Sequence, residues 1–239
     1  IQVIPNDPRY GSAYYLPLLR LPQTWDLVKG DGTMILTAPD TGIPLLGHED
    51  LILSPGGYSF SDKLFNTVPN LFDGKITGTT THGTNCAGLI SAITNNNLGV
   101  SSSIWSAKLL PIKIAVADQK GATHDTYIAQ SIEYSALKGA KVCSLSWSRI
   151  GAYDMSIYTV AKKYSDRMTV LIGAGNDNKN LRNGTTCDYA IWIGASNEND
   201  VRAPFSAYGS GVDVFAPGTN LITTTMGDLY EKSSRYGSF

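Results

Sequence analysis

The sequence predicts an α/β protein, built on a mainly parallel sheet of about seven strands with helices on both faces. Short apolar segments alternate with helix-like segments along the chain, as they do in sheets of this type. Apolar residues make up 42% of the 239 residues, which is enough for a substantial core. No internal repeat or low-complexity linker interrupts the alternation. We therefore expect residues 1–239 to form one domain.

The first strand is expected to place a carboxylate at its end. Residues 16–29 have the helical spacing of an arm packed on the body, and residues 33–38 form a short apolar strand. Asp40 follows that strand, within a turn marked by Pro39 and Gly42. Open α/β sheets carry functional groups at the carboxyl ends of their strands. The alternative interpretation is that Asp40 only closes the turn.

A histidine follows the loop-rich residues 54–79. Small and apolar residues at Ala87, Leu89 and Ile90 predict a helix that begins close to His82. Because the pKa of a histidine lies near neutrality, His82 is suited to general acid–base chemistry. A purely structural role beside the following glycine is the alternative.

The second half of the chain continues the alternation. Amphipathic helices are expected over residues 125–138 and 156–165. Strands are expected over residues 108–116, 141–146, 169–173, 188–195 and 212–216.

Composition argues against several classes of protein. A net charge of −1 gives no electrostatic case for binding nucleic acid or an anionic membrane, so neither partner is expected. No apolar run approaches the roughly 20 residues of a membrane span. Residues 1–7 are typical of a mature or trimmed start, so no signal peptide is expected in this sequence. Cys86, Cys143 and Cys187 form no disulfide framework; the first two are expected to be buried and Cys187 exposed.

Four glycine-flanked polar residues stand out, namely Asp40, His82, Asn176 and Ser238. Acyl transfer needs a nucleophile, a base, an acid that orients the base, and donors for the oxyanion. These residue types are all present. No G-x-G-x-x-G or Walker motif follows a strand, which argues against a nucleotide-binding enzyme.

The motifs around these residues resemble those of the subtilisin family of serine proteases, and in particular its thermitase-like members. The similar segments keep the family's order and comprise residues 5–8, 40–43 with 48–51, 81–84 with 87–88, 144–148, 174–176 and 213–218. The resemblance implies a three-layer fold and a secreted or extracytoplasmic serine endopeptidase. It also implies that Asp40 orients His82, that His82 is base and then acid, and that Ser238 attacks the scissile carbonyl to form an acyl-enzyme. The Asn176 amide would then donate to the oxyanion.

The same resemblance implies where a peptide or protein substrate binds. An extended peptide is expected to add as a strand between residues 144–148 and a segment near Gly121. The expected contact residues are Gly121, Ser144, Ser146, Trp147, Ser148, Gly173, Ala174 and Gly175. No acidic residue is evident there, so apolar or aromatic side chains are expected before the scissile bond. Trp147 is equally interpretable as a core aromatic residue.

The nucleophile segment departs from the family pattern, which is Gly-Thr-Ser-x-Ala followed by a helix. This chain has Tyr236-Gly237-Ser238-Phe239 and then stops. We expect a C-terminal segment that is cleaved off, disordered or carried as a separate chain. Ser233 and Ser234 are fallback nucleophiles. The departure leaves open an alternative function, a catalytically impaired protein of this fold that binds peptides without cleaving them.

The resemblance finally implies a structural Ca²⁺ site. Asp7 and Asp50 lie in motifs where thermitase-like proteases supply carboxylates. The other expected ligands are the Asn96 side-chain oxygen and the backbone carbonyls of Ile93, Leu98 and Val100. Oxygen ligands of this kind suit Ca²⁺ better than Zn²⁺. Alternatively, Asp7 caps a turn, Asp50 faces water and the asparagine run is a plain loop.

Overall fold

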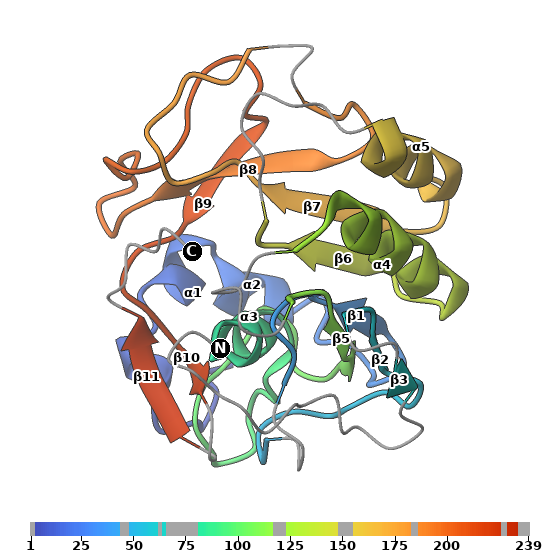
Figure 1. Cartoon of the computed structure of the whole chain (residues 1–239). Coiled ribbons are helices and arrows are strands. Elements are labelled where there is room, and N and C mark those ends of the chain that lie inside the picture. The colour runs from blue at the N-terminus through green and yellow to red at the C-terminus, as the bar shows by residue number, and fades with distance from the viewer. Residues whose placement is uncertain are drawn as a thin grey trace.

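A six-stranded parallel sheet lies at the centre of the computed structural model (Figure 1). The structure describes residues 3–43, 48–61, 64–65, 81–116, 123–147, 155–182, 186–225 and 229–233. The strand order is β4-β1-β6-β7-β8-β9, and all neighbours pair in parallel. The strands are β1 Ile35–Thr37, β4 Lys108–Leu110, β6 Val142–Leu145, β7 Thr169–Gly173, β8 Ile191–Ser196 and β9 Val214–Pro217. The predicted α/β class is confirmed, with six strands in the described part against the roughly seven expected.

Helices cover both faces of this sheet. They are α3 His82–Ser91, α4 Asp125–Leu137 and α5 Met155–Tyr164, and α4 and α5 lie side by side (Figure 1). Leu110 of β4 packs with residues of α4, whereas the preceding Leu109 packs with Ala87 of α3. Because successive residues of a strand point to opposite faces, α3 and α4 lie on opposite sides of the sheet. Among the described residues, no helix has the length and apolar character needed to cross a membrane.

The single strand predicted over residues 108–116 is wrong. It is two strands, because the chain leaves the large sheet at Pro111, which has no N–H to donate. The second strand, β5 Ile112–Lys113, joins β2 Tyr58–Ser59 and β3 Leu64–Phe65 in a small sheet.

The N-terminal arm is shorter and more broken than predicted. A 3₁₀ turn, η1 Tyr10–Ser12, precedes α1 Tyr15–Leu18 and α2 Leu21–Trp25. Arg20 separates the two helices with a left-handed φ of 55°, and residues 26–29 are not helical. The continuous helix predicted over residues 16–29 is therefore wrong.

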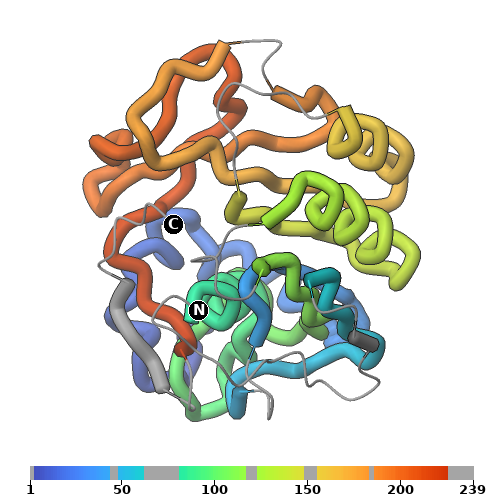
Figure 2. The backbone as a smooth tube through the Cα atoms, in the orientation of Figure 1, coloured from blue at the N-terminus to red at the C-terminus, as the bar shows by residue number. Residues whose placement is uncertain are grey.

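The arm packs against β10 Leu221–Thr225, a strand from the far end of the chain (Figure 2). This strand forms an antiparallel hairpin with β11 Leu229–Ser233. The Tyr14 hydroxyl donates to the carbonyl of Thr219, and the Tyr15 hydroxyl donates to that of Ile222, both at 2.8 Å. The β10 strand also lies against α3, so the arm, the hairpin and the histidine helix form one packed unit.

All three cysteines are free thiols, but their burial differs in part from the expectation. Cys143 is buried as expected, and burial raises the pKa of its thiol to about 12. Cys187 is buried rather than exposed, because it packs in the main hydrophobic core, and burial raises the pKa of its thiol as well. Cys86 is only half-buried.

Candidate active site

The polar residues predicted from the motifs gather at one edge of the sheet. Strands β1, β6 and β7 are neighbours and run parallel, so their carboxyl ends meet at that edge. Asp40 follows β1, Ser146 follows β6, and Asn176 follows β7. Segments far apart in the sequence thereby present a carboxylate, a hydroxyl and an amide on the same side of the molecule.

The backbone of Asp40 is fixed by the small sheet. Its N–H donates to the Ile112 carbonyl at 3.1 Å, and its own carbonyl accepts from the Ile114 N–H at 2.9 Å. The carboxylate is almost fully buried, with 1% of the residue exposed, and its Oδ1 accepts the Thr41 N–H at 2.7 Å. Oδ2 is buried and has no hydrogen-bond partner among the described residues.

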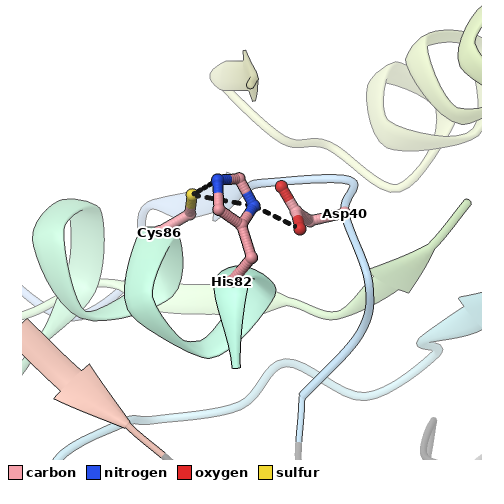
Figure 3. A group of neighbouring side chains, drawn as sticks. All are labelled: Asp40, His82 and Cys86. Atoms are coloured by element: carbon pink, nitrogen blue, oxygen red, sulfur yellow. Dashed lines mark hydrogen bonds and ion pairs between the residues drawn. The ribbon is translucent and has the colours of Figure 1, made fainter. Parts of the chain in front are cut away.

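A glycine at the start of α3 brings the helix against this turn. The Gly83 N–H donates to Thr41 Oγ1 at 2.9 Å, and a Cβ at Gly83 would overlap the Gly42 carbonyl. Gly42 has a φ of 96°, which favours glycine. This close approach places His82 Nδ1 2.8 Å from Asp40 Oδ1 (Figure 3).

Burial and the neighbouring carboxylate act on His82 in opposite directions. Burial lowers the pKa of the imidazole, whereas the charge and hydrogen bond of Asp40 raise it, and the net pKa is raised. The site therefore stabilises the imidazolium relative to the neutral ring. With Nδ1 facing the carboxylate, Nε2 is the ring nitrogen that points away from Asp40 (Figure 3).

Cys86 lies one helical turn after His82 and packs on the side of the ring away from Asp40 (Figure 3). Its sulfur lies 3.8 Å from Nδ1 and 3.9 Å from Nε2, and 3.3 Å from the Ser146 hydroxyl oxygen. The described residues contain this one group of three potential metal ligands, Asp40, His82 and Cys86. Since the sulfur is nearly equidistant from both ring nitrogens, it does not lie along a ring lone pair. It packs against the imidazole ring.

Several residues expected to bind substrate border the same edge. The pairing of β6 with β1 stops at Cys143, whereas its pairing with β7 continues to Leu145. On the β1 side, residues 144–147 therefore have no strand partner among the described residues. Ser146 is exposed and Ser144 half-buried, while Gly173, Ala174 and Gly175 end β7 and begin the turn to Asn176. The predicted residues Gly121, Ser148 and Ser238 lie outside the described residues.

Trp147 and Ala174 both pack against buried parts of the protein. The Trp147 ring is half-buried and packs against the core between the sheet and the helices α4 and α5. Its Nε1 is buried and has no hydrogen-bond partner in the described part of the chain. The Ala174 methyl group is buried against Leu181 and Ala207, which leaves only its backbone to line a pocket.

The residues expected to bind calcium also come together, around two buried carboxylates. Asp7 and Asp50 are 4% and 0% exposed, and neither forms an ion pair within the described residues. Asp7 accepts the N–H groups of Asn95 and Asn96, both at 2.9 Å. Asp50 accepts the Asn96 side-chain amide at 2.7 Å and the Val100 N–H at 3.1 Å. The alternative that Asp50 faces water is thus wrong.

The electrostatics of this cluster favour a cation. Burial raises the pKa of Asp50 to about 6, and the negative charges of Asp7 and Glu49 add to the increase. Within the described residues no positive charge faces these two buried carboxylates, and carboxylate oxygens are the ligand type that Ca²⁺ takes. The Asn96 side-chain oxygen, which accepts the Leu98 N–H at 2.8 Å, and the carbonyls of the 93–100 loop are further oxygens close by.

Comparison with known proteins agrees with this geometry. A model of the subtilase family matches residues 39–238. The chain is 34% identical to thermitase of Thermoactinomyces vulgaris over 235 residues, which cover 96% of this chain and 79% of thermitase. It is 27% identical to an extracellular basic protease of Dichelobacter nodosus, spanning 98% of this chain but only 45% of that protein. A protease from Pseudoalteromonas arctica has a similar fold, with a TM-score of 0.81, 25% identity, and coverage of 98% and 83%.

The fold and the paired carboxylate and imidazole thus define a protein of the serine endopeptidase class. The chain belongs to the subtilase family.

One contact of the site was missed by reasoning from sequence. The resemblance already implied a cysteine beside the base, and Cys86 lies four residues after His82 on the same helix face. The contact between Cys86 and Ser146 joins residues 60 positions apart, and no local pattern signals it.

Proposed function

We propose that this chain is a secreted serine endopeptidase that cleaves peptide bonds through an acyl-enzyme on Ser238. The observation that carries the proposal is the 2.8 Å contact between Asp40 Oδ1 and His82 Nδ1 at the carboxyl edge of the sheet. The family match extends to residue 238, which supports Ser238 as the nucleophile. Secretion is supported by the extracellular protease among its relatives.

In this mechanism the proton moves through His82. Nε2 removes the proton of Ser238 as the hydroxyl oxygen attacks the scissile carbonyl carbon, and Asp40 stabilises the resulting imidazolium. His82 then gives the proton to the departing amine, which leaves the acyl group on Ser238. A water molecule repeats the sequence and releases the acid. Asn176 donates its side-chain amide to the oxyanion in both halves of the reaction.

The substrate would bind along the unpaired side of residues 144–147. An extended peptide can take main-chain hydrogen bonds there, as an added strand. The contribution of Gly121 and Ser148 follows from the family resemblance alone. Because no acidic residue is found among the predicted contact residues, we propose that apolar or aromatic side chains are accepted before the scissile bond. A peptide library with a strict preference for Arg or Lys at that position would contradict this.

The test must separate cleavage from peptide binding, since Tyr236 and Gly237 depart from the family pattern. A serine-directed fluorophosphonate should label the native protein, and peptide mass spectrometry should place the label on Ser238. Ser238→Ala should abolish both labelling and hydrolysis, whereas Ser233→Ala and Ser234→Ala should retain them. An unlabelled protein that still binds peptides would establish the impaired binding protein instead. A label on Ser233 or Ser234 would show that this serine, and not Ser238, is the nucleophile.

We further propose that the Asp7 and Asp50 cluster binds a structural Ca²⁺ ion. Asp7, Asp50, Asn96 and the carbonyls of Ile93, Leu98 and Val100 would hold it. The ion would supply the positive charge that the two buried carboxylates lack and would join the N-terminal arm to the loop after α3. An ion that binds only the folded state stabilises it by about 2.7 kcal/mol at a hundredfold excess over its Kd.

Removal of the ion tests this second proposal. EDTA should lower the melting temperature of the native protein, and added Ca²⁺ should restore it. Asp7→Asn combined with Asp50→Asn should abolish the sensitivity, because the shape is kept and the charge is lost. Asp31→Asn, at an exposed carboxylate, is the matched control and should remain sensitive. A melting temperature that EDTA leaves unchanged would refute the site.

A further inference from the structure

The turn that carries Asn176 is attached to a distant segment, residues 202–209. Backbone hydrogen bonds join the two on both sides of Asn176, from the Ala207 N–H to the Gly175 carbonyl at 2.9 Å and from the Asn178 N–H to the Phe205 carbonyl at 2.7 Å. Further along, the Leu181 N–H donates to the Tyr208 carbonyl at 2.7 Å. Gly209 then passes so close that a Cβ there would overlap the Asn180 side chain.

The exposed Arg202 side chain adds further contacts between the Asn176 turn and residues 202–209. Its Nη1 donates to the Asn178 side-chain oxygen at 2.9 Å and to the Ser206 carbonyl at 2.6 Å. The guanidinium carbon lies 4.9 Å from the centre of the Tyr208 ring. A planar guanidinium can stack on a ring and donate in its own plane at the same time, which a lysine ammonium cannot do.

The anchored residue sits two positions after Asn176 and has an unusual backbone. Asn178 has a left-handed φ of 52°, which asparagine tolerates better than most residues. Asn176 and Asn178 are both exposed. The hydrogen bond from Arg202 therefore reaches the side chain of a residue in the Asn176 turn.

We propose that Arg202 is a positioning residue, which fixes the turn at Gly175–Asn178 so that the Asn176 amide is held where the oxyanion forms. The proposal rests on the oxyanion role assigned to Asn176 above. An oxyanion donor is effective only when it is aimed in advance, and a displacement of about 1 Å can cost about a hundredfold in rate. Arg202 itself touches neither the substrate nor the reacting atoms.

A double-mutant cycle tests this inference. Arg202→Met keeps the aliphatic stem and removes the donors, and it should lower kcat about tenfold while KM changes by less than about twofold. Arg202→Lys should lie between Arg202→Met and the native enzyme. Asn178→Asp keeps the acceptor oxygen and should retain activity, whereas Asn178→Gly removes it without straining the backbone and should match Arg202→Met. Lys162→Met, which removes an exposed cation from above Tyr158 and Tyr189, is the control and should be neutral.

The Asn176→Ala background decides between positioning and general stability. If Arg202 acts through Asn176, then Arg202→Met should change kcat by less than about twofold once Asn176 is alanine. Fluorophosphonate titration of active enzyme corrects for any unfolded fraction, and Arg202→Lys completes the cycle if Arg202→Met does not fold. Additive losses in kcat from Arg202→Met and Asn176→Ala, or a native kcat in Arg202→Met, would overturn the positioning role of Arg202 but leave the oxyanion role of Asn176 standing. A native kcat in Asn176→Ala would overturn the oxyanion role and, with it, this inference.

Discussion

Replacement of Asp40 by asparagine removes the charge that supports His82 and keeps the shape of the side chain. Asp40 is 1% exposed and its Oδ1 lies 2.8 Å from the imidazole, so water screens the pair poorly. Opposite charges about 4 Å apart attract by about 4 kcal/mol at an effective dielectric constant near 20. Since about 1.4 kcal/mol corresponds to a factor of ten, Asp40→Asn should lower kcat/KM about a thousandfold.

The pH dependence gives this prediction a second, independent readout. The neutral ring is the base, so kcat/KM of the native enzyme should rise with pH as His82 loses its proton. Because Asp40 raises the pKa of His82, this rise should lie above the ordinary value of 6.5. In Asp40→Asn the charge is gone and burial still lowers the pKa, so the rise should move to lower pH.

The assay is hydrolysis of a chromogenic peptide from pH 5 to 10, normalised by active-site titration. Asp31→Asn makes the same chemical change at an exposed carboxylate, whose Oδ1 accepts from Thr33, and it should change neither the rate nor the pH profile. A loss of less than about tenfold in kcat/KM for Asp40→Asn, or a pH profile that coincides with that of the native enzyme, would contradict the role of the Asp40 charge.

Three further predictions follow from the packing and charges. A Cβ at Gly88 would lie 2.6 Å from Thr223 Oγ1, so Gly88→Ala should lower the free energy of unfolding by about 1–3 kcal/mol, measured with denaturant. Gly11→Ala, whose Cβ would meet nothing within 4 Å, is the control and should leave the stability unchanged. Equal stability of the two variants would contradict the packing of α3 on β10. Iodoacetamide at neutral pH should modify the half-buried Cys86 before the buried Cys143 and Cys187. This modification should reduce activity because the Cys86 sulfur contacts His82. If peptide mass spectrometry showed Cys143 modified first, the burial of Cys143 would be contradicted. The pKa of Asp50 is raised from 3.8 to about 6, so without an ion the folded protein loses stability from this group as the pH rises from about 4 to 6. Ca²⁺ should bind the ionised carboxylate, and the rise in melting temperature on adding Ca²⁺ should therefore be large at pH 7.5 and small at pH 5. An equal rise at both pH values would contradict the role of Asp50.

The elements that could be predicted are those whose sequence pattern is local. The strand over residues 169–173 is present as β7, and the helix predicted over residues 125–138 ends one residue earlier as α4. The periodicity of these segments reflects the faces that they bury, so it could be interpreted without the rest of the chain. The predicted ends of strands and helices are wrong where contacts with distant parts of the chain determine where the element stops. At Pro111 the chain changes sheets, and at Arg20 a left-handed residue breaks the arm.

The site was predicted in parts for the same reason. Asp40 and His82 carry glycine-flanked motifs, which point to their chemistry but not to their distance. Their contact depends on the close approach of Gly83 to the Gly42 carbonyl, which no spacing in the sequence reveals. The attachment of the Asn176 turn by Arg202 likewise joins residues more than twenty positions apart. Such long-range contacts depend on the assembled sheet and not on local propensity.

The central claim is that Ser238 forms a covalent acyl-enzyme with the help of His82 and Asp40. It is tested most directly by mixing the protein with a p-nitrophenyl ester at mildly acidic pH, where deacylation is slow, and measuring intact and peptide masses after quenching. We predict one acyl group per molecule on Ser238, absent from Ser238→Ala and formed far more slowly in His82→Ala. A protein that hydrolyses the ester without a trapped acyl group, or that carries the group on another residue, would contradict the claim.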